Sequence, residues 1–272
     1  SKEVLLKMAQ AGMDVARINF SHGDHVQHQA LMDLVRGVNT DGGFNIKILQ
    51  DLEGYRIRIG RLKKPVELKK GETVTIVPGM EQDGAAIPME SDADLSTIKK
   101  GMTVFIDDGL IALEVEKSHR TRLQVRVVQG RLLKSRKGVN IPGFKFQANI
   151  LTSKDKADID FGLKNKVDFV AQSFVRNRDD ILRVAKLVKP GLPSCRIFAK
   201  IESEDGVRNT DAIMDACDGI LIARGDLGVS LPIYRIPVIQ KSIIRRCNKQ
   251  KKYSITATQM LESMTENPRP TR

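Results

Sequence analysis

The sequence predicts an α/β protein, an incomplete (β/α)8 TIM barrel interrupted by a small all-β barrel. Apolar residues recur alternately with strand and helix periods at both ends of the chain. Between these ends, about a hundred residues form short alternating runs separated by Gly-containing turns. Without this insert only six predicted strands remain, whereas a closed barrel needs eight strands and about 250 residues.

The first part of the barrel is expected over residues 1–54. Val4 and Met8 lie on one face of a predicted helix that Gly12 ends, and a strand follows at residues 14–20. A second amphipathic helix precedes another strand at residues 46–50. The two pairs of elements are typical of a parallel sheet covered by helices.

The insert is expected over residues 55–149. Short runs with strand periodicity are bounded there by turn residues, which is typical of an all-β domain. The predicted strands are residues 73–77, 102–106, 111–115 and 123–128.

The second part of the barrel is expected over residues 150–272. Strand ends recur roughly every 25 to 30 residues, the size of a βαβ unit, so the strands should be parallel. A doubly wound open sheet is the structural alternative, but no GxGxxG follows any strand, which disfavours it. The predicted strands are residues 167–174, 196–202, 219–223 and 253–258, with helices from Thr152 and Asn177 and over residues 209–217 and 233–249.

The net charge of +12 results from 45 basic and 33 acidic residues that are interspersed. No nucleic-acid-binding motif accompanies this charge, so we expect a basic surface that attracts phosphorylated small molecules, and no nucleic-acid partner.

No apolar stretch approaches membrane-spanning length. The cysteines (Cys195, Cys217 and Cys247) are odd in number and lack CxxC spacing, which indicates a reducing cytoplasm.

Polar residues gather where the first two predicted strands end. Arg17, Asn19 and Ser21 share one face of the first strand, and Asp51 follows the second. A guanidinium suits phosphate, while amide and hydroxyl oxygens suit a hard cation or phosphate. Because reactive groups collect at the C-terminal ends of barrel strands, these residues are candidates for a site.

Two later strand ends carry a lysine and two carboxylates. Lys200 and Glu202 lie on one face of the same strand, and Asp226 follows the next strand. A buried ion pair is the structural alternative, but two carboxylates from adjacent strands also hold Mg²⁺ in proteins. We expect these three side chains to converge on one divalent ion. Thr258 ends the last predicted strand, and Lys137 lies in a Gly/Pro-punctuated loop of the insert.

Taken together, these segments resemble the pyruvate kinase family over nearly the whole chain. The motifs that match in order and spacing are ARINFSHG, the Asp51 turn, KGVNIPG, LTSKDKADIDFG, VDFVAQSFVR, IFAKIESEDG, DGILIARGDLGV, ATQMLES and NPRPTR. The resemblance implies phosphoryl transfer from phosphoenolpyruvate to ADP, giving pyruvate and ATP in the last step of glycolysis. It also implies that the insert is a mobile lid domain.

The resemblance implies a role for each matching residue. The implied catalytic residues are Lys200, Thr258 and Arg17. The implied contacts of phosphoenolpyruvate are these three residues together with Gly225 and Asp226. Mg²⁺ (or Mn²⁺) would be held by Glu202 and Asp226. The remaining positions match a K⁺ site (Asn19, Ser21, Asp51 and the Leu52 carbonyl) and the ADP/ATP contacts (Asn19, Phe20, Ser21, His22, Arg58 and Lys137).

Arg56 departs from the family pattern. Tyr55 and Arg56 stand where the family has Pro followed by Glu or Lys, and Ser230 replaces a common acidic residue. In the family, a Glu at the position of Arg56 accompanies dependence on potassium. A Lys there accompanies independence of potassium, because a fixed cation can take the place of the ion. We therefore hypothesise that Arg56 reduces or abolishes the K⁺ requirement.

The resemblance further implies that the family's first and eighth barrel strands and its C-terminal domain are absent from these 272 residues. We expect a cytoplasmic homotetramer for the full-length protein and no activity for this chain alone. A Mg²⁺-dependent pyruvate or phosphoenolpyruvate lyase on a similar barrel is the rival enzyme, and a regulatory or RNA-binding paralogue is the non-enzymatic alternative.

Overall fold

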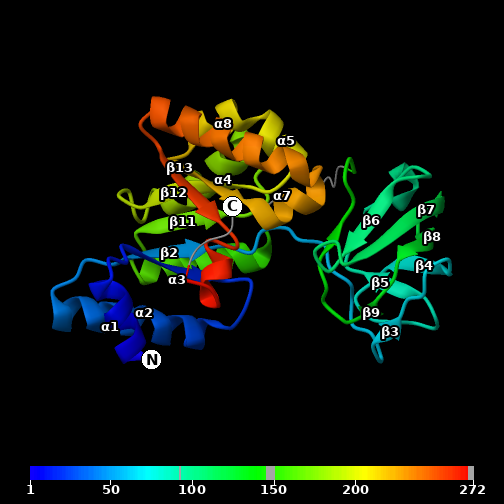
Figure 1. Cartoon of the computed structure of the whole chain (residues 1–272), viewed down its shortest axis with the longest axis horizontal. Helices are drawn as coiled ribbons and strands as arrows, with labels where there is room; N and C mark the ends of the chain where they lie inside the picture. Colours follow the sequence, from blue (N-terminus) through cyan, green and yellow to red (C-terminus); the bar gives the residue numbers. More distant parts are fainter. Residues whose placement is uncertain (92, 145–150, 269–272) are drawn as a thin grey trace. The chain divides into compact units, whose positions relative to one another are not determined.

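The computed structural model describes residues 1–91, 93–144 and 151–268 (Figure 1). The chain forms two compact units. Unit 1 consists of Ser1–Tyr55, Asn149–Arg224 and Pro237–Arg272, and unit 2 consists of Arg56–Ala148 and Gly225–Ile236.

Unit 1 is built on a six-stranded parallel sheet in the order β1-β2-β11-β12-β13-β14. The α/β fold class predicted from the sequence, with an incomplete barrel, is confirmed. Among the described residues, β1 and β14 are the edges of this sheet. The strands are β1 (Val15–Asn19), β2 (Lys47–Asp51), β11 (Phe169–Gln172), β12 (Arg196–Ile201), β13 (Gly219–Ala223) and β14 (Tyr253–Ala257).

Helices connect these strands, and several begin at side-chain caps. Asp24 and Asn177 accept hydrogen bonds from backbone amides of the first turns of α2 and α4, and Thr152 forms a capping box with Asp155 at α3. The helices are α1 (Lys2–Gln10), α2 (His25–Gly42), α3 (Ser153–Lys164), α4 (Arg178–Val188), α5 (Glu204–Arg208), α6 (Thr210–Ala216), α7 (Arg224–Ser230) and α8 (Ile236–Lys249).

The sheet register aligns the C-terminal ends of the strands. Asn19 on β1 pairs with Asp51 on β2, and Asp51 pairs with Ala171 on β11. Gln172 at the end of β11 pairs with Ala199 on β12. Because the strands are parallel, the residues that follow them emerge at one edge of the sheet.

The apolar side chains of neighbouring strands form the core of the sheet. Leu49, Ala171 and Phe198 pack together, each at most 2% exposed, with the partly buried Phe169 and Ile255 against them. Burial of such side chains stabilises the fold by about 1.5–3 kcal/mol each. This core supports the strand ends above it.

Unit 2 contains an all-β insert, as the sequence predicts. Its main sheet has the order β10-β6-β7-β8-β4-β5, and β3 pairs with β9 in a second, two-stranded sheet. The strands are β3 (Val66–Glu67), β4 (Thr73–Pro78), β5 (Ile87–Met89), β6 (Thr103–Ile106), β7 (Ile111–His119), β8 (Arg122–Gln129), β9 (Leu132–Leu133) and β10 (Val139–Asn140). Short 3-10 turns occur in this unit at Leu95–Thr97 and Ile233–Arg235, and in unit 1 at Glu262–Thr265.

One segment connects the two edges of the main sheet in unit 2. The Val139 amide of β10 donates to the Ile57 carbonyl, and Ile59 forms a bridge with Met89 of β5. The Gly60 amide also donates to the Pro88 carbonyl. These bonds close the sheet on itself, so backbone groups at both of its edges have partners.

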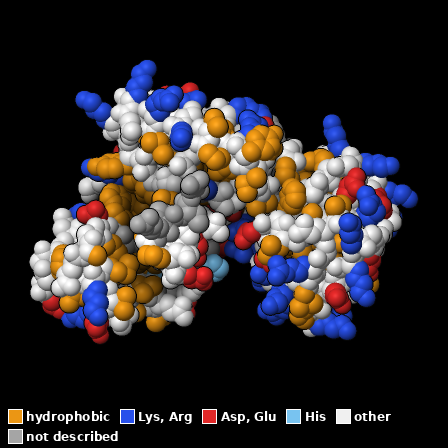
Figure 2. All heavy atoms as spheres, viewed as in Figure 1, with side chains coloured by type: hydrophobic (Ala, Val, Ile, Leu, Met, Phe, Trp, Pro, Cys, Tyr) orange, Lys and Arg blue, Asp and Glu red, His pale blue; other side chains and the backbone are white. Residues whose placement is uncertain are grey.

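In Figure 2, several groups of Lys and Arg side chains lie on the surface of unit 2 with Asp and Glu side chains among them, whereas much of the visible surface of unit 1 is uncharged. No large region of a single charge is visible in this view. Among the described residues, no helix is both long and apolar enough to cross a membrane.

The three cysteines are free and buried, so they are expected to be unreactive in the folded chain. Burial raises the pKa of the Cys195 thiol to about 12 and that of Cys217 to about 11, and it also raises the pKa of Cys247. Only the thiolate reacts with disulfide reagents. Ellman's reagent at pH 8 should therefore label these thiols only after unfolding, and rapid labelling of the folded chain would contradict the prediction.

Candidate active site

Lys200 lies between two carboxylates at the C-terminal end of the sheet. Its Nζ is 2.9 Å from Asp51 Oδ1 and 3.2 Å from Glu202 Oε1. The three residues are 8%, 0% and 2% exposed, respectively. Asp51 ends β2, Lys200 is on β12 and Glu202 follows β12 directly, so the two strands on either side of β11 bring them together.

The surroundings of Lys200 keep its ammonium charged. Burial alone would lower the pKa of Lys200, but the negative charges of Glu202 and Asp51 more than offset it, so the pKa is raised. Its three N–H donors face Asp51, Glu202 and Ser173, so what it offers a further anion is its positive charge.

Ser173 and Phe174 complete this cluster, and our sequence reasoning assigned no role to either residue. Ser173 Oγ accepts a hydrogen bond from Lys200 Nζ at 2.6 Å and donates one to the Leu52 carbonyl at 2.6 Å. The Phe174 amide donates to Glu202 Oε2 at 2.6 Å. Phe174 has φ of 55°, the left-handed conformation of a tight turn after β11. This turn therefore orients both Lys200 and Glu202. The signals for these residues were a serine directly after a buried strand and the motif VDFVAQSFVR that contains both of them.

Arg17 on β1 approaches the same carboxylate from the other side. Its Nε is 2.5 Å from Asp51 Oδ2, and its side chain is 49% exposed while that of Asp51 is buried. Asp51 thus faces two cations. The exposed guanidinium can still contact an anionic ligand, which is consistent with the predicted phosphate-binding role.

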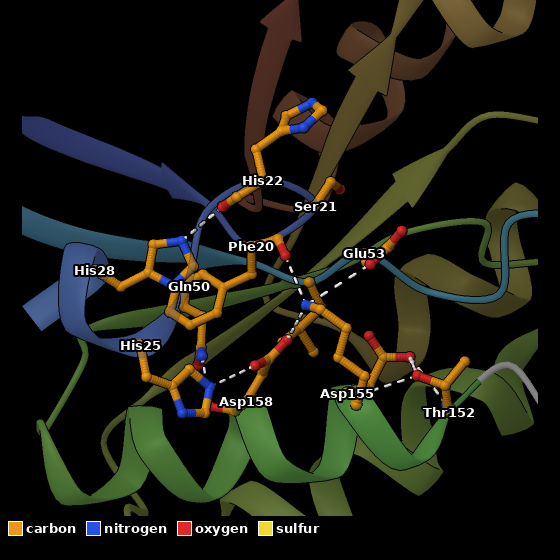
Figure 3. A network of polar contacts seen from close by, with 12 residues as sticks. Phe20, Ser21, His22, His25, His28, Gln50, Glu53, Thr152, Asp155 and Asp158 are labelled. Carbon is orange, nitrogen blue, oxygen red and sulfur yellow. Dashed lines mark hydrogen bonds and ion pairs between the residues drawn. The ribbon is translucent and has the colours of Figure 1, made fainter. Parts of the chain in front are cut away.

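The turn after β1 (residues 19–22) carries the predicted cation and nucleotide contacts. Asn19 Oδ1 accepts a hydrogen bond from the Ser21 amide at 3.0 Å. The Phe20 amide donates to the Asp51 carbonyl at 2.9 Å, which attaches the turn to β2. Figure 3 shows Phe20 pointing toward His28, with the backbone of His22 within hydrogen-bonding distance of that ring.

Asp226 follows β13 and lies in a short helix. α7 begins directly after β13, so Gly225 and Asp226 lie in its first turn. Within unit 2, Arg56 Nη2 is 2.7 Å from Asp108 Oδ1 and 3.8 Å from Asp226 Oδ1. Asp226 thus lies beside the Arg56 guanidinium in the first turn of α7.

The two basic residues predicted to contact nucleotide lie in unit 2. Arg58 Nη1 donates to the Arg136 carbonyl at 3.2 Å, and Lys137 Nζ is 2.8 Å from Asp107 Oδ1. Both lie beside the segment that closes the β-sheet, since Arg58 forms a bridge with Gly138.

Thr258 follows β14 in a strained conformation. Its φ is 75°, which is unusual for a β-branched residue. Its carbonyl accepts a hydrogen bond from the Arg224 guanidinium, which also donates to the Ala257 carbonyl at 3.0 Å. Residues held in such conformations cluster at functional sites.

The chemistry of the donors fits Mg²⁺. Glu202 presents a carboxylate beside Lys200 at the C-terminal edge of the sheet, and Asp226 presents another at the start of α7. The described residues form no cluster of three or more His, Cys, Asp or Glu side chains that could hold a metal alone. Mg²⁺ needs no such cluster, because substrate phosphates and water supply most of its ligands.

Comparison with known proteins identifies the family. The family model described as "Pyruvate kinase, barrel domain" matches residues 1–272. The chain belongs to the pyruvate kinase family. The pyruvate kinases of Clostridium acetobutylicum, Clostridium perfringens and Geobacillus stearothermophilus are 44%, 40% and 41% identical to it, with the whole chain covered. The chain spans 58%, 58% and 47% of these three proteins.

Within this chain, unit 1 brings Arg17, Asp51, Lys200 and Glu202 together. The turn at residues 19–22 joins them through the bond between the Phe20 amide and the Asp51 carbonyl. The expected convergence of Asp226 with Lys200 and Glu202 stays a prediction.

Proposed function

We propose that the protein containing this chain transfers the phosphoryl group of phosphoenolpyruvate to ADP, giving pyruvate and ATP. The supporting observation is the buried Lys200, which faces Asp51 and Glu202 at the strand ends of a pyruvate kinase barrel. Phosphoryl transfer depends mainly on positioning and on stabilisation of charge, which such a cation supplies.

Each residue of the site takes one part of the reaction. Arg17 binds the phosphate of phosphoenolpyruvate, and Thr258 with the Gly225 and Asp226 backbone holds the substrate. The positive charge of the Lys200 ammonium stabilises the phosphoryl group in flight and the developing enolate. Ser173 fixes one of its donor directions, because its hydroxyl accepts a Lys200 hydrogen bond at 2.6 Å. Glu202 and Asp226 would hold Mg²⁺ or Mn²⁺, which when bound neutralises phosphoryl charge.

The nucleotide would lie against the turn at residues 19–22, with Arg58 and Lys137 contributing from the insert. We propose that residues 55–149 act as a lid that excludes water during transfer.

The full-length protein is inferred to be a cytoplasmic homotetramer. Residues 1–272 alone are inferred to be inactive, because β1 and β14 are the edges of the described sheet.

A coupled assay for pyruvate tests this function. The full-length protein should form pyruvate from phosphoenolpyruvate only when ADP and Mg²⁺ are both present. Pyruvate release without ADP would instead support a phosphatase or lyase. The absence of both turnover and Mg²⁺-ADP binding would support the non-enzymatic alternative.

The full-length protein is expected to be active without K⁺. In the structure, three of the four residues of the proposed K⁺ site have a protein partner for an oxygen: Asn19 Oδ1 accepts from the Ser21 amide, Asp51 faces Arg17 and Lys200, and the Leu52 carbonyl accepts from Ser173. Because these oxygens already have protein partners, a K⁺ ion that binds to them would gain less free energy. Arg56 supplies a further fixed cation near Asp226.

Titration with KCl in a Na⁺- and K⁺-free buffer tests the expectation. Added K⁺ should change the turnover number of the parent protein by less than about twofold. It should raise the turnover number of Arg56→Glu about tenfold or more. Arg61→Glu is the matched control, because Arg61 lies in the same segment and is 3.7 Å from the surface residue Glu81. A strict K⁺ requirement in the parent protein would refute the hypothesis.

A further inference from the structure

Lys154 contacts the candidate site from α3, although its sequence pattern predicted no role for it. Its Nζ donates to the Phe20 carbonyl at 2.6 Å and to Asp158 Oδ2 at 2.6 Å, and it is 3.7 Å from Glu53 Oε2. The Phe20 carbonyl belongs to the turn at residues 19–22. A lysine on a separate helix thus binds the backbone of that turn directly.

Asp158 holds the Lys154 ammonium in place. The Asp158 side chain is 3% exposed, and both of its oxygens are used, Oδ1 by His25 Nε2 at 2.7 Å and Oδ2 by Lys154. The Asp158 carbonyl also accepts from Gln50 Nε2 at 2.6 Å. Figure 3 shows Asp158 projecting from α3 toward His25. Because the residue is buried, with its other carboxylate oxygen held by His25 and its backbone carbonyl by Gln50, it gives Lys154 one preferred position.

A second contact restrains the other end of the turn. His28 Nε2 lies 2.8 Å from the His22 carbonyl and must therefore carry the proton that it donates. The His28 ring also packs on the Phe20 ring, with centroids 3.9 Å apart. The carbonyls of Phe20 and His22 thus point outward to donors on α3 and α2. Since backbone carbonyls repel phosphate, this arrangement directs them away from the site.

We propose that Lys154 is a positioning residue that holds the turn at residues 19–22 in the conformation that receives the nucleotide. This inference rests on the proposed function, since it assigns the turn to ADP. It does not place Lys154 in contact with substrate, because the ammonium is already bound to Phe20 and Asp158. Lys154 is therefore expected to affect ADP binding more than phosphoenolpyruvate binding.

Lys154→Met in the full-length protein tests the proposal, because methionine keeps the apolar stem and removes the three donors. The KM for ADP should rise about tenfold, while the KM for phosphoenolpyruvate should change less than about twofold. Lys156→Met is the control, since Lys156 is an exposed lysine two positions further along α3. An unchanged KM for ADP, or equal changes in both KM values, would overturn the proposal.

Hydrogen exchange provides a test that does not depend on activity. The amides of Phe20, Ser21 and His22 all bond to Asn19 or Asp51 and should exchange faster in Lys154→Met than in Lys156→Met. Equal exchange in the two variants would show that Lys154 does not hold the turn. If the parent protein lacks kinase activity, the proposed function fails, and exchange still decides the structural role.

A second variant covers the case in which Lys154→Met does not fold. Asp158→Asn keeps the size of the side chain and removes the charge that fixes Lys154. It should raise the KM for ADP and accelerate exchange at the same amides, to a smaller degree. No change in either measurement would overturn the proposal.

Discussion

Replacing Lys200 by methionine is expected to lower the turnover number of the full-length protein by about 10³-fold, the upper end of the loss seen when one charge-stabilising donor is removed. The side chain is 10% exposed and its Nζ lies within 3.2 Å of Asp51 and Glu202 carboxylate oxygens. No described neighbour occupies this position between the two carboxylates, so methionine leaves the transferred phosphoryl group without its buried cation. Steady-state pyruvate formation from saturating substrates measures the effect.

The same substitution should also destabilise the fold. Breaking a buried ion pair costs about 3–5 kcal/mol, because the remaining charge stays uncompensated. Lys200→Arg is the matched control: it keeps the positive charge but not the point-like ammonium, so it should retain more stability while losing most of its turnover. Variants must first be shown to be folded by circular dichroism. Turnover of Lys200→Met within tenfold of the parent protein would exclude the proposed mechanism.

The raised pKa of Lys200 gives this prediction a pH dependence. A folded-state pKa above the ordinary 10.5 means that the charged lysine stabilises the fold fully below pH 10.5. The contribution is lost as the pH rises through the folded-state pKa. Urea unfolding at increasing pH should therefore show the stability difference between parent and Lys200→Met shrinking above pH 10.5. A difference that stays constant into this range would contradict the assignment.

Replacing Ser173 by alanine should have the second-largest effect on the site. Its hydroxyl accepts from the Lys200 ammonium and donates to the Leu52 carbonyl, both at 2.6 Å, and the residue is 2% exposed. A hydrogen bond to a charged group contributes about 1.5–3 kcal/mol, so the free energy of unfolding should fall by about 2 kcal/mol. The Lys200 ammonium would also lose the hydrogen bond that fixes its orientation, which should lower turnover about tenfold.

Ser153→Ala is the control for this experiment. Ser153 is an exposed serine at the first position of α3, so its removal should change neither turnover nor stability measurably. Denaturant unfolding and initial-rate kinetics on both variants make the comparison. Equal behaviour of Ser173→Ala and the parent protein would show that the turn after β11 does not orient Lys200.

The sequence alone predicted the sheet and the strand-end residues of the site. Alternation with a period of two placed Lys200 and Glu202 on one strand face, and the βαβ spacing predicted parallel strands whose ends share one edge. That edge is where Asp51, Lys200 and Glu202 meet. The four longest strands of the insert were also predicted, because their apolar alternation is regular. Periodicity is a local property, so sequence reasoning can detect it.

Tertiary structure alone decided the contacts that orient these residues. Lys154 and Phe20 are 134 positions apart, and Ser173 and Leu52 are 121 apart. Neither pair lies in a periodic pattern, since each hydrogen bond joins a turn or a helix end to a distant backbone carbonyl. Likewise, the closure of the β-sheet by the segment near Ile59 depends on two edges that meet only after folding. The sequence therefore determined which side chains reach the site, and the packing of the chain determined what fixes them there.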